Sequence, residues 1–295
     1  MRVGRYDVKT ILAGLFKLDG GAMFGNVPKV LWSREQPPDE SNRIEMTTRV
    51  LLLRGEIEGR ERVILVDTGC GEKFGEKEVG IFAIDNESRS LAKGLAAHGV
   101  RREQVTDVIH THLHFDHCGG TTQFGADGSI ELTFPNAEIW VQRSNWETAR
   151  APNLRERASY LPENLDLLES SGRLRLLEGE DPILPGLVPF LSNGHTAGMM
   201  GLKVEGESDD APALYFPADL MPLSSHLKLP YTMGYDLHAA WILEEKERLL
   251  GRIRPQHDVV VFEHDPRVGG VLVAPGKRYL EIVETVELDD VNDFL

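Results

Sequence analysis

Cysteine is scarce in this chain of 295 residues, which contains only Cys70 and Cys118. Two cysteines are too few for a disulfide framework or for a zinc site made of cysteines. The simplest interpretation is a pair of reduced, mostly buried thiols that pack like small apolar residues, although the sequence leaves room for one disulfide.

Long uncharged apolar runs are also absent. No stretch approaches the ~18 residues that a membrane span needs, and the first seven residues lack the apolar core of a signal peptide. We therefore expect a cytoplasmic protein with no membrane partner.

Basic residues are fewer than acidic ones: the chain has 32 Lys and Arg but 47 Asp and Glu, which gives a formal net charge of −15. Such a chain repels phosphate backbones, and no cluster of Lys or Arg offers a compensating patch. Nucleic acid is therefore excluded as the expected partner. The length permits one large domain or two small ones, but no linker divides the chain, so we predict a single domain over 1–295.

Short apolar runs alternate with helical stretches, and most runs end in polar residues. Such runs predict buried strands, and stripes with helical period predict helices. The strands are expected at 63–66, 105–110, 139–141, 187–191, 214–216 and 259–262, and the helices at 89–98, 153–171 and 239–253. This alternation is typical of an α/β domain with its chemistry at strand ends.

The densest group of metal-ligating side chains is the segment His112-Leu113-His114-Phe115-Asp116-His117. In an extended segment, side chains two positions apart point the same way, so His112 and His114 can converge on one ion. Asp116 and His117 follow closely enough to serve a second ion. Imidazole and carboxylate groups suit Zn²⁺. Since the chain has only 10 histidines, three of them within six positions favour a metal site over chance.

Three later residues could complete a two-metal site. His195 lies in a Gly-His-Thr turn, Asp219 follows one expected strand, and His264 follows the last. A single His or Asp in a loop is more often solvated than coordinating, so the prediction depends on their combination with the motif. Two divalent ions need roughly eight protein and solvent ligands, often with one bridging carboxylate, and this set fits that need.

Together these residues resemble the metallo-β-lactamase superfamily, with its H-x-H-x-D-H signature, an upstream Asp after a strand, Gly-His-Thr, a late Asp and a final His. The resemblance covers most of the chain and implies an αββα sandwich with the metals at one edge between two β-sheets. It implies that one metal takes His112, His114 and His195, that the other takes Asp116, His117 and His264, and that Asp219 bridges them. Asp67 resembles the residue that steadies a histidine ligand, although an Asp that caps a turn is an equally simple interpretation.

Finer features resemble N-acyl homoserine lactone lactonases of the quorum-quenching type and methyl parathion hydrolases. They are the segment 18–32, with Met23 and Phe24, and the segment that runs from Asp219 through His226 to 236. One departure is that 220–225 lacks the Tyr that some lactonases place a few residues after the bridging Asp. His226 is a candidate substitute, and an exposed loop His is the alternative.

The expected reaction is hydrolysis of a small neutral ester or lactone, most simply the opening of an N-acyl homoserine lactone. Two Zn²⁺ ions with Asp219 would hold a solvent molecule of lowered pKa, and Asp116 is the candidate for passing a proton to the leaving alkoxide. Met23, Phe24 and Phe115 are candidates for an apolar acyl groove, with core packing as the alternative. The same ligands also suit Mn, Fe or Co, and the sequence is compatible with an oligomer.

Other classes of protein share parts of this pattern. A phosphotriesterase would direct the same nucleophile at phosphorus, and the segment around Met23 does not separate it from a lactonase. A persulfide dioxygenase would use one iron, and His264 argues against it because its position after a strand suits a second-metal ligand. A glutathione thioesterase would need a basic C-terminal patch, which we do not find, and the complete ligand set disfavours a non-catalytic metal-binding module.

Overall fold

Two long antiparallel strands, β2 (Tyr6–Asp19) and β3 (Arg43–Ile57), dominate the first of two large sheets. The computed structural model describes residues 1–288. This sheet has seven strands in the order β1-β2-β3-β4-β5-β8-β9, and the neighbours from β4 to β9 are parallel. Its other strands are β1 (Arg2–Val3), β4 (Arg60–Val66), β5 (Asp107–Ile109), β8 (Glu138–Gln142) and β9 (Leu174–Leu177).

The second sheet has six strands in sequential order, β10 to β15, and only β12 and β13 are parallel neighbours. The strands are β10 (Leu187–Ser192), β11 (Met199–Val204), β12 (Leu214–Phe216), β13 (Val259–Val261), β14 (Gly270–Pro275) and β15 (Leu280–Val286). A separate hairpin pairs β6 (Thr122–Phe124) with β7 (Ile130–Leu132). The six expected strands thus coincide with β4, β5, β8, β10, β12 and β13.

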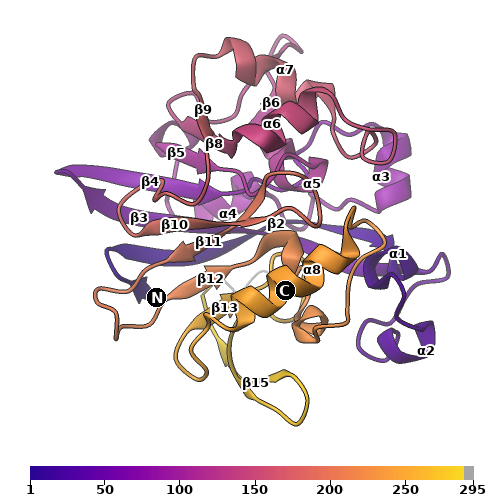
Figure 1. Ribbon diagram of the computed structural model, residues 1–295. Helices are drawn as coiled ribbons and strands as arrows, with labels where there is room; N and C mark the ends of the chain where they lie inside the picture. Colours follow the sequence, from indigo (N-terminus) through magenta and orange to yellow (C-terminus); the bar gives the residue numbers. More distant parts are fainter. Residues whose placement is uncertain (289–295) are drawn as a thin grey trace.

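Helices cover the outer faces of the two sheets. Figure 1 shows α6 (Arg143–Arg150) and α7 (Pro162–Ser170) on one side of the paired sheets and α8 (Ala239–Leu250) on the other. One apolar cluster joins the first sheet to α6, α7 and α4 (Leu91–Ala97), a second fills the space between the sheets, and a third joins the second sheet to α8. These three layers of apolar contact confirm the predicted αββα sandwich.

The remaining helices are short and lie in the connections. Ser90 caps α4, because its hydroxyl accepts a hydrogen bond from the Lys93 backbone amide. The others are α1 (Gly20–Phe24), α2 (Lys29–Trp32), α3 (Glu76–Phe82) and α5 (Phe115–Cys118), with 3₁₀ turns η1 (Arg102–Gln104), η2 (Gly119–Thr121), η3 (Ala218–Leu220) and η4 (Ser224–Leu227).

The helix expected over 153–171 is only half present. Helix α7 begins at Pro162, where a fixed φ and a missing N–H suit the first helical position. The residues before it form turns, and the Phe115 backbone amide donates a hydrogen bond to the Ser159 carbonyl. This contact holds the segment against α5, so tertiary packing replaces the first turns of the expected helix.

Among residues 1–288, no helix has both the length and the apolar character that crossing a membrane requires. The single domain expected over 1–295 stays a prediction, since its last seven residues lie outside the described part of the chain.

Candidate metal centre

The polar residues that follow five strands meet at one edge of the sandwich. Strands β4, β5, β12 and β13 lead into Asp67, His112, Asp219 and His264, and His195 lies in the turn between β10 and β11. Two non-glycine residues here adopt positive φ, Asp67 at 61° and Ala218 at 49°. Such backbone is disfavoured for L-residues and tends to cluster at functional sites.

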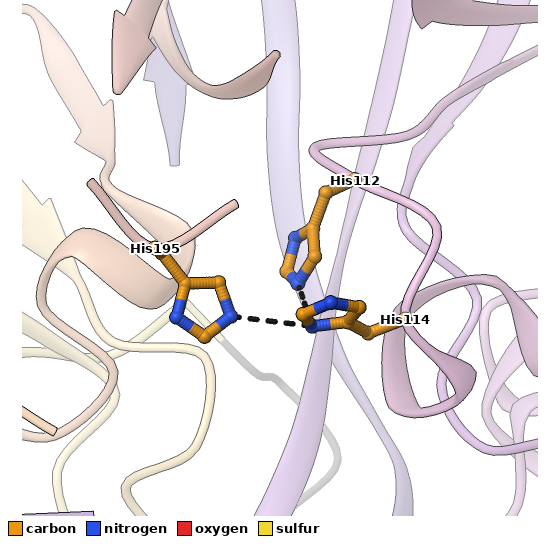
Figure 2. A group of neighbouring side chains, drawn as sticks. All are labelled: His112, His114 and His195. Carbon is orange, nitrogen blue, oxygen red and sulfur yellow. Dashed lines mark hydrogen bonds between the residues drawn. The ribbon is translucent and has the colours of Figure 1, made fainter. Parts of the chain in front are cut away.

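Three histidines form the first group of candidate ligands, with their ring nitrogens turned toward one another (Figure 2). Nδ1 of His114 lies 3.1 Å from Nε2 of His112 and 3.2 Å from Nε2 of His195. All three side chains are buried, with at most 8% exposed. Their ligand atoms are close enough to share one ion.

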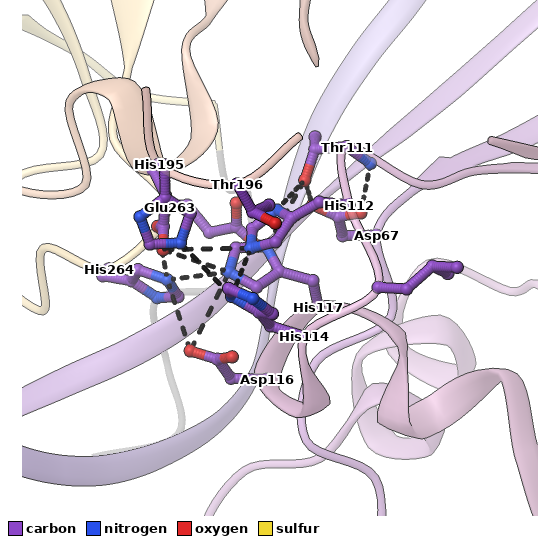
Figure 3. Close-up of polar contacts among 12 residues, drawn as sticks. Asp67, Thr111, His112, His114, Asp116, His117, His195, Thr196, Glu263 and His264 are labelled. Atoms are coloured by element: carbon purple, nitrogen blue, oxygen red, sulfur yellow. Dashed lines mark hydrogen bonds and ion pairs between the residues drawn. The ribbon is translucent and has the colours of Figure 1, made fainter. Parts of the chain in front are cut away.

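Asp116, His117 and His264 form the second group. Nε2 of His264 lies 3.3 Å from Nε2 of His117, and Oδ2 of Asp116 lies 3.7 and 3.8 Å from these two nitrogens. Figure 3 shows this group beside the first one.

Asp219 lies between the two groups. Its Oδ2 is 3.2 Å from Nε2 of His195, and its Oδ1 is 3.1 Å from Nε2 of His264. The carboxylate can therefore reach an ion in either group, as a bridging ligand must. The structure brings together all seven side chains that the sequence proposed as ligands.

The hydrogen-bonding capacity of these groups fits bound cations. Nδ1 of His114 faces two other imidazole nitrogens. A ring nitrogen carries either one hydrogen or one lone pair, so it cannot form a good hydrogen bond with both neighbours. Burial, together with the neighbouring imidazoles, lowers the pKa of His112 and His114 well below the usual value. Both rings are therefore neutral near pH 7, with lone pairs available to a metal.

The acidic residues have the opposite effect on the second group. Burial alone would lower the pKa of His117, but the carboxylates of Glu263, Asp116 and Asp219 raise it well above its usual value. Burial likewise opposes the charged form of His264, yet Asp219 and Glu263 raise its pKa to about 9. The carboxylates thus favour positive charge on these two rings, and a divalent cation at the second group can supply that charge in place of the protons.

Hydrogen bonds on the outer ring nitrogens orient the candidate ligands. Nδ1 of His264 donates to the Thr47 carbonyl at 2.9 Å, which turns Nε2 toward His117 and Asp219. Nδ1 of His117 lies 3.1 Å from Oδ2 of Asp67, and Asp67 also accepts from the Thr111 amide and hydroxyl at 2.8 and 2.6 Å. These contacts support the orienting role expected for Asp67.

Asp236 lies in the segment that resembles the lactonases, but the sequence alone did not identify it as a residue that orients a ligand. Its Oδ1 lies 3.0 Å from Nδ1 of His195, and its Oδ2 accepts from the Met233 backbone amide at 2.7 Å. Burial would lower the pKa of His195, but Asp219 and Asp236 raise it. Asp236 lies 41 positions from His195, so no local pattern connects the two residues.

A cavity of about 310 Å³ opens onto both groups. One part of its wall is polar and contains His114, Asp116, His195, Asp219 and His264; another part is apolar and contains Leu18, Met23, Met46, Phe82, Phe115, Met233 and Tyr235. The Phe82 and Phe115 rings pack with their centroids 5.0 Å apart. Arg155 and Glu156 from the turns before α7 also line the cavity.

Two of the four expected substrate contacts, Met23 and Phe115, are among the residues that line this cavity. Phe24 and His226 are not, because they are buried behind the wall, where their rings stack with centroids 5.3 Å apart. Nε2 of His226 lies 3.1 Å from the Met23 carbonyl, and burial lowers the pKa of this ring to about 3. Phe24 and His226 therefore shape the wall from behind.

The stretch 220–225 contributes no tyrosine, but Tyr235 reaches the cavity from a later loop. Burial, with the charges of Asp19 and Asp116, raises the pKa of Tyr235 to about 12, so its hydroxyl keeps its proton at neutral pH. Cys70 and Cys118 are both free and buried, as expected.

Comparison with known proteins agrees with this geometry. The chain is 28% identical over 218 residues to an N-acyl homoserine lactonase of Bacillus cereus, an alignment that covers 71% of this chain and 79% of the relative. A probable metal-dependent hydrolase from Staphylococcus aureus has a similar structure, with a TM-score of 0.85, 28% identity, and coverage of 97% of this chain and 100% of that one.

The dizinc quorum-quenching lactonase AidC shares the fold, with a TM-score of 0.74, 18% identity, and coverage of 97% of this chain and 96% of that one. The family model of the metallo-beta-lactamase superfamily matches residues 50–264, a range that spans the sites from Asp67 to His264. The chain therefore belongs to the metallo-beta-lactamase superfamily, as an enzyme related to the N-acyl homoserine lactonases at modest identity.

Proposed function

We propose that this protein is a dinuclear zinc hydrolase that opens N-acyl homoserine lactones. The observation that carries the proposal is the pairing of two ligand groups, bridged by Asp219, with a cavity that is polar beside the ligands and apolar beyond them. The lactonase names of the relatives support the same substrate class.

In this proposal, one ion would be held by His112, His114 and His195 and the other by Asp116, His117 and His264, with Asp219 within reach of both groups. Two divalent ions supply Lewis acidity and a water molecule of lowered pKa. Asp116, His117 and His264 provide a second group of ligands beside the first, and this supports a dinuclear hydrolase over a mononuclear iron dioxygenase.

The side chains of the cavity perform the remaining tasks. The apolar wall formed by Met23, Phe82 and Phe115 binds an acyl chain and excludes water from the reacting carbonyl. Asp116 reaches into the cavity beside the other candidate ligands. It would accept the proton that water gives up as it attacks the carbonyl carbon, and pass it to the alkoxide oxygen that forms when the C–O bond of the ring breaks. Tyr235 retains its proton and can donate a hydrogen bond to a substrate oxygen.

The test is elemental analysis of the purified protein, followed by turnover of acyl homoserine lactones and of an organophosphate triester. We expect about two zinc ions per chain and faster turnover of the lactones. About one iron per chain with no lactone hydrolysis would refute the proposal, and preference for the triester would assign the site to phosphotriester hydrolysis instead.

A further inference from the structure

Glu263 is a buried carboxylate with no role in the ligand set described above. It follows β13 and directly precedes His264, and its side chain is completely buried. Its backbone is fixed, since its carbonyl accepts a hydrogen bond from the Arg49 amide at 3.0 Å. The Arg49 guanidinium also holds residues 262–265 in place, because it donates hydrogen bonds to the carbonyls of Phe262 and Asp265.

The carboxylate of Glu263 faces the outer nitrogen of His117. Oε1 of Glu263 lies 3.1 Å from this Nδ1, which is also 3.1 Å from Oδ2 of Asp67. A single N–H can satisfy only one of the two carboxylates well. Figure 3 shows Glu263 and Asp67 in this cluster of polar contacts around the histidines.

The two carboxylates differ in how their other lone pairs are satisfied. Asp67 accepts two hydrogen bonds from Thr111. In contrast, neither side-chain oxygen of Glu263 has a hydrogen-bond partner within the described part of the chain. A buried carboxylate without donors is costly unless positive charge lies close by. The rings next to it are those of His117 and His264, whose Nε2 atoms face the second ligand group.

We propose that Glu263 is a second positioning residue for His117, which acts with Asp67 to raise the affinity of the Asp116, His117 and His264 group for a divalent cation. Asp67 holds the hydrogen bond to Nδ1 and fixes the ring. The carboxylate of Glu263, 3.1 Å from the same Nδ1, adds negative charge that makes Nε2 a stronger ligand for a cation. The bound cation in turn balances the charge of Glu263. This inference rests on the proposed dinuclear site.

The experiment uses the full chain, stripped with a chelator and titrated with Zn²⁺ in competition with a chromophoric chelator. Wild type is compared with Glu263→Gln, which preserves size, and Glu263→Met, which removes the polar atoms. We expect wild type to bind two ions, and both variants to bind one of them about 10- to 100-fold more weakly. Glu56→Gln, an exposed change at the far end of β3, should retain both affinities.

The gain in thermal midpoint on adding Zn²⁺ provides a second readout. Both Glu263 variants should gain less than wild type, because the second ion binds them more weakly. In contrast, Asp67→Asn should melt lower without metal, because it disturbs the bonds from Thr111.

Several outcomes would overturn the inference. Unchanged zinc affinities in both Glu263 variants would do so, and so would a gain in thermal midpoint on adding Zn²⁺ that equals the gain of wild type in both. A third ion that binds wild type and is lost in both variants would assign Asp67, His117 and Glu263 as ligands instead. Fewer than two ions in wild type would refute the dinuclear site itself, and the inference would fall with it.

Discussion

Nε2 of His264 lies 3.3 Å from Nε2 of His117, although 147 positions of sequence separate the two residues. One follows β13 in the second sheet, and the other lies in α5 after β5 of the first sheet. Packing of the two sheets therefore creates the second ligand group, and neither half of the chain contains it alone.

His264→Ala should lower the metal content from about two ions to about one per chain, because the group that holds the second ion loses one of its three terminal ligands. The measurement is elemental analysis after dialysis against zinc-free buffer. His257→Ala is the matched control, since His257 follows α8, outside the ligand groups, and its side chain is 37% exposed. Two ions retained by His264→Ala would contradict the assignment.

Asp236→Asn should weaken the other ion about 10- to 100-fold, because the amide replaces the carboxylate that orients His195 through Nδ1. Lactone turnover at limiting zinc should fall, and saturating zinc should restore part of it. The readout is the zinc dependence of kcat, compared with that of Asp210→Asn, an exposed change outside the cavity. If wild type and Asp236→Asn show the same zinc dependence, Asp236 does not orient His195.

The sequence predicted the ligands better than the residues around them. His112, His114, Asp116 and His117 lie within six positions, so their spacing alone indicates a metal site. Asp236 and Tyr235 belong to the segment that resembles the lactonases, but the sequence assigned them no role, because only the folded loop brings them to His195 and the cavity. The sequence shows that Glu263 is adjacent to His264, but it does not show that the Glu263 side chain is buried.

The same contrast applies to the fold. Continuous apolar runs such as 63–66 and 259–262 revealed the strands that are buried on both faces. The long strands β2 and β3 were missed, although residues 50–53 of β3 form a continuous apolar run. In β2, polar residues and glycine interrupt the apolar ones, and a register shift between Leu12 and Leu15 breaks the regular pattern. Their pairing depends on residues far apart in sequence.

Phe82→Ala should discriminate between lactones by chain length. Phe82 lines the cavity and packs against Phe115, so its loss removes apolar contact from a long acyl chain and not from a short one. We expect kcat/KM to fall about tenfold for a decanoyl lactone, equivalent to about 1.4 kcal/mol, and to change little for a butanoyl lactone. Ile81→Ala, on the same helix but 51% exposed, is the control. Equal losses for both substrates would place the acyl chain elsewhere.

The burial of Lys246 predicts that the free energy of unfolding depends on pH for a reason separate from the metal centre. This side chain of α8 is fully buried, and its Nζ donates to the carbonyls of Lys228, Leu229 and Tyr231. Burial lowers its pKa to about 7, against about 10.4 in an unfolded chain. Between these values the unfolded state holds a proton that the folded state has released, so the free energy of unfolding rises with pH.

Lys246→Met removes this dependence. Between pH 7 and about pH 10, the free energy of unfolding of wild type should increase relative to that of the variant by up to about 1.4 kcal/mol per pH unit. Urea denaturation of both proteins at each pH, with a chelator present, measures the difference, and groups common to both proteins cancel. A difference that stays flat over this range would mean that the three carbonyls keep the Lys246 ammonium charged in the folded protein.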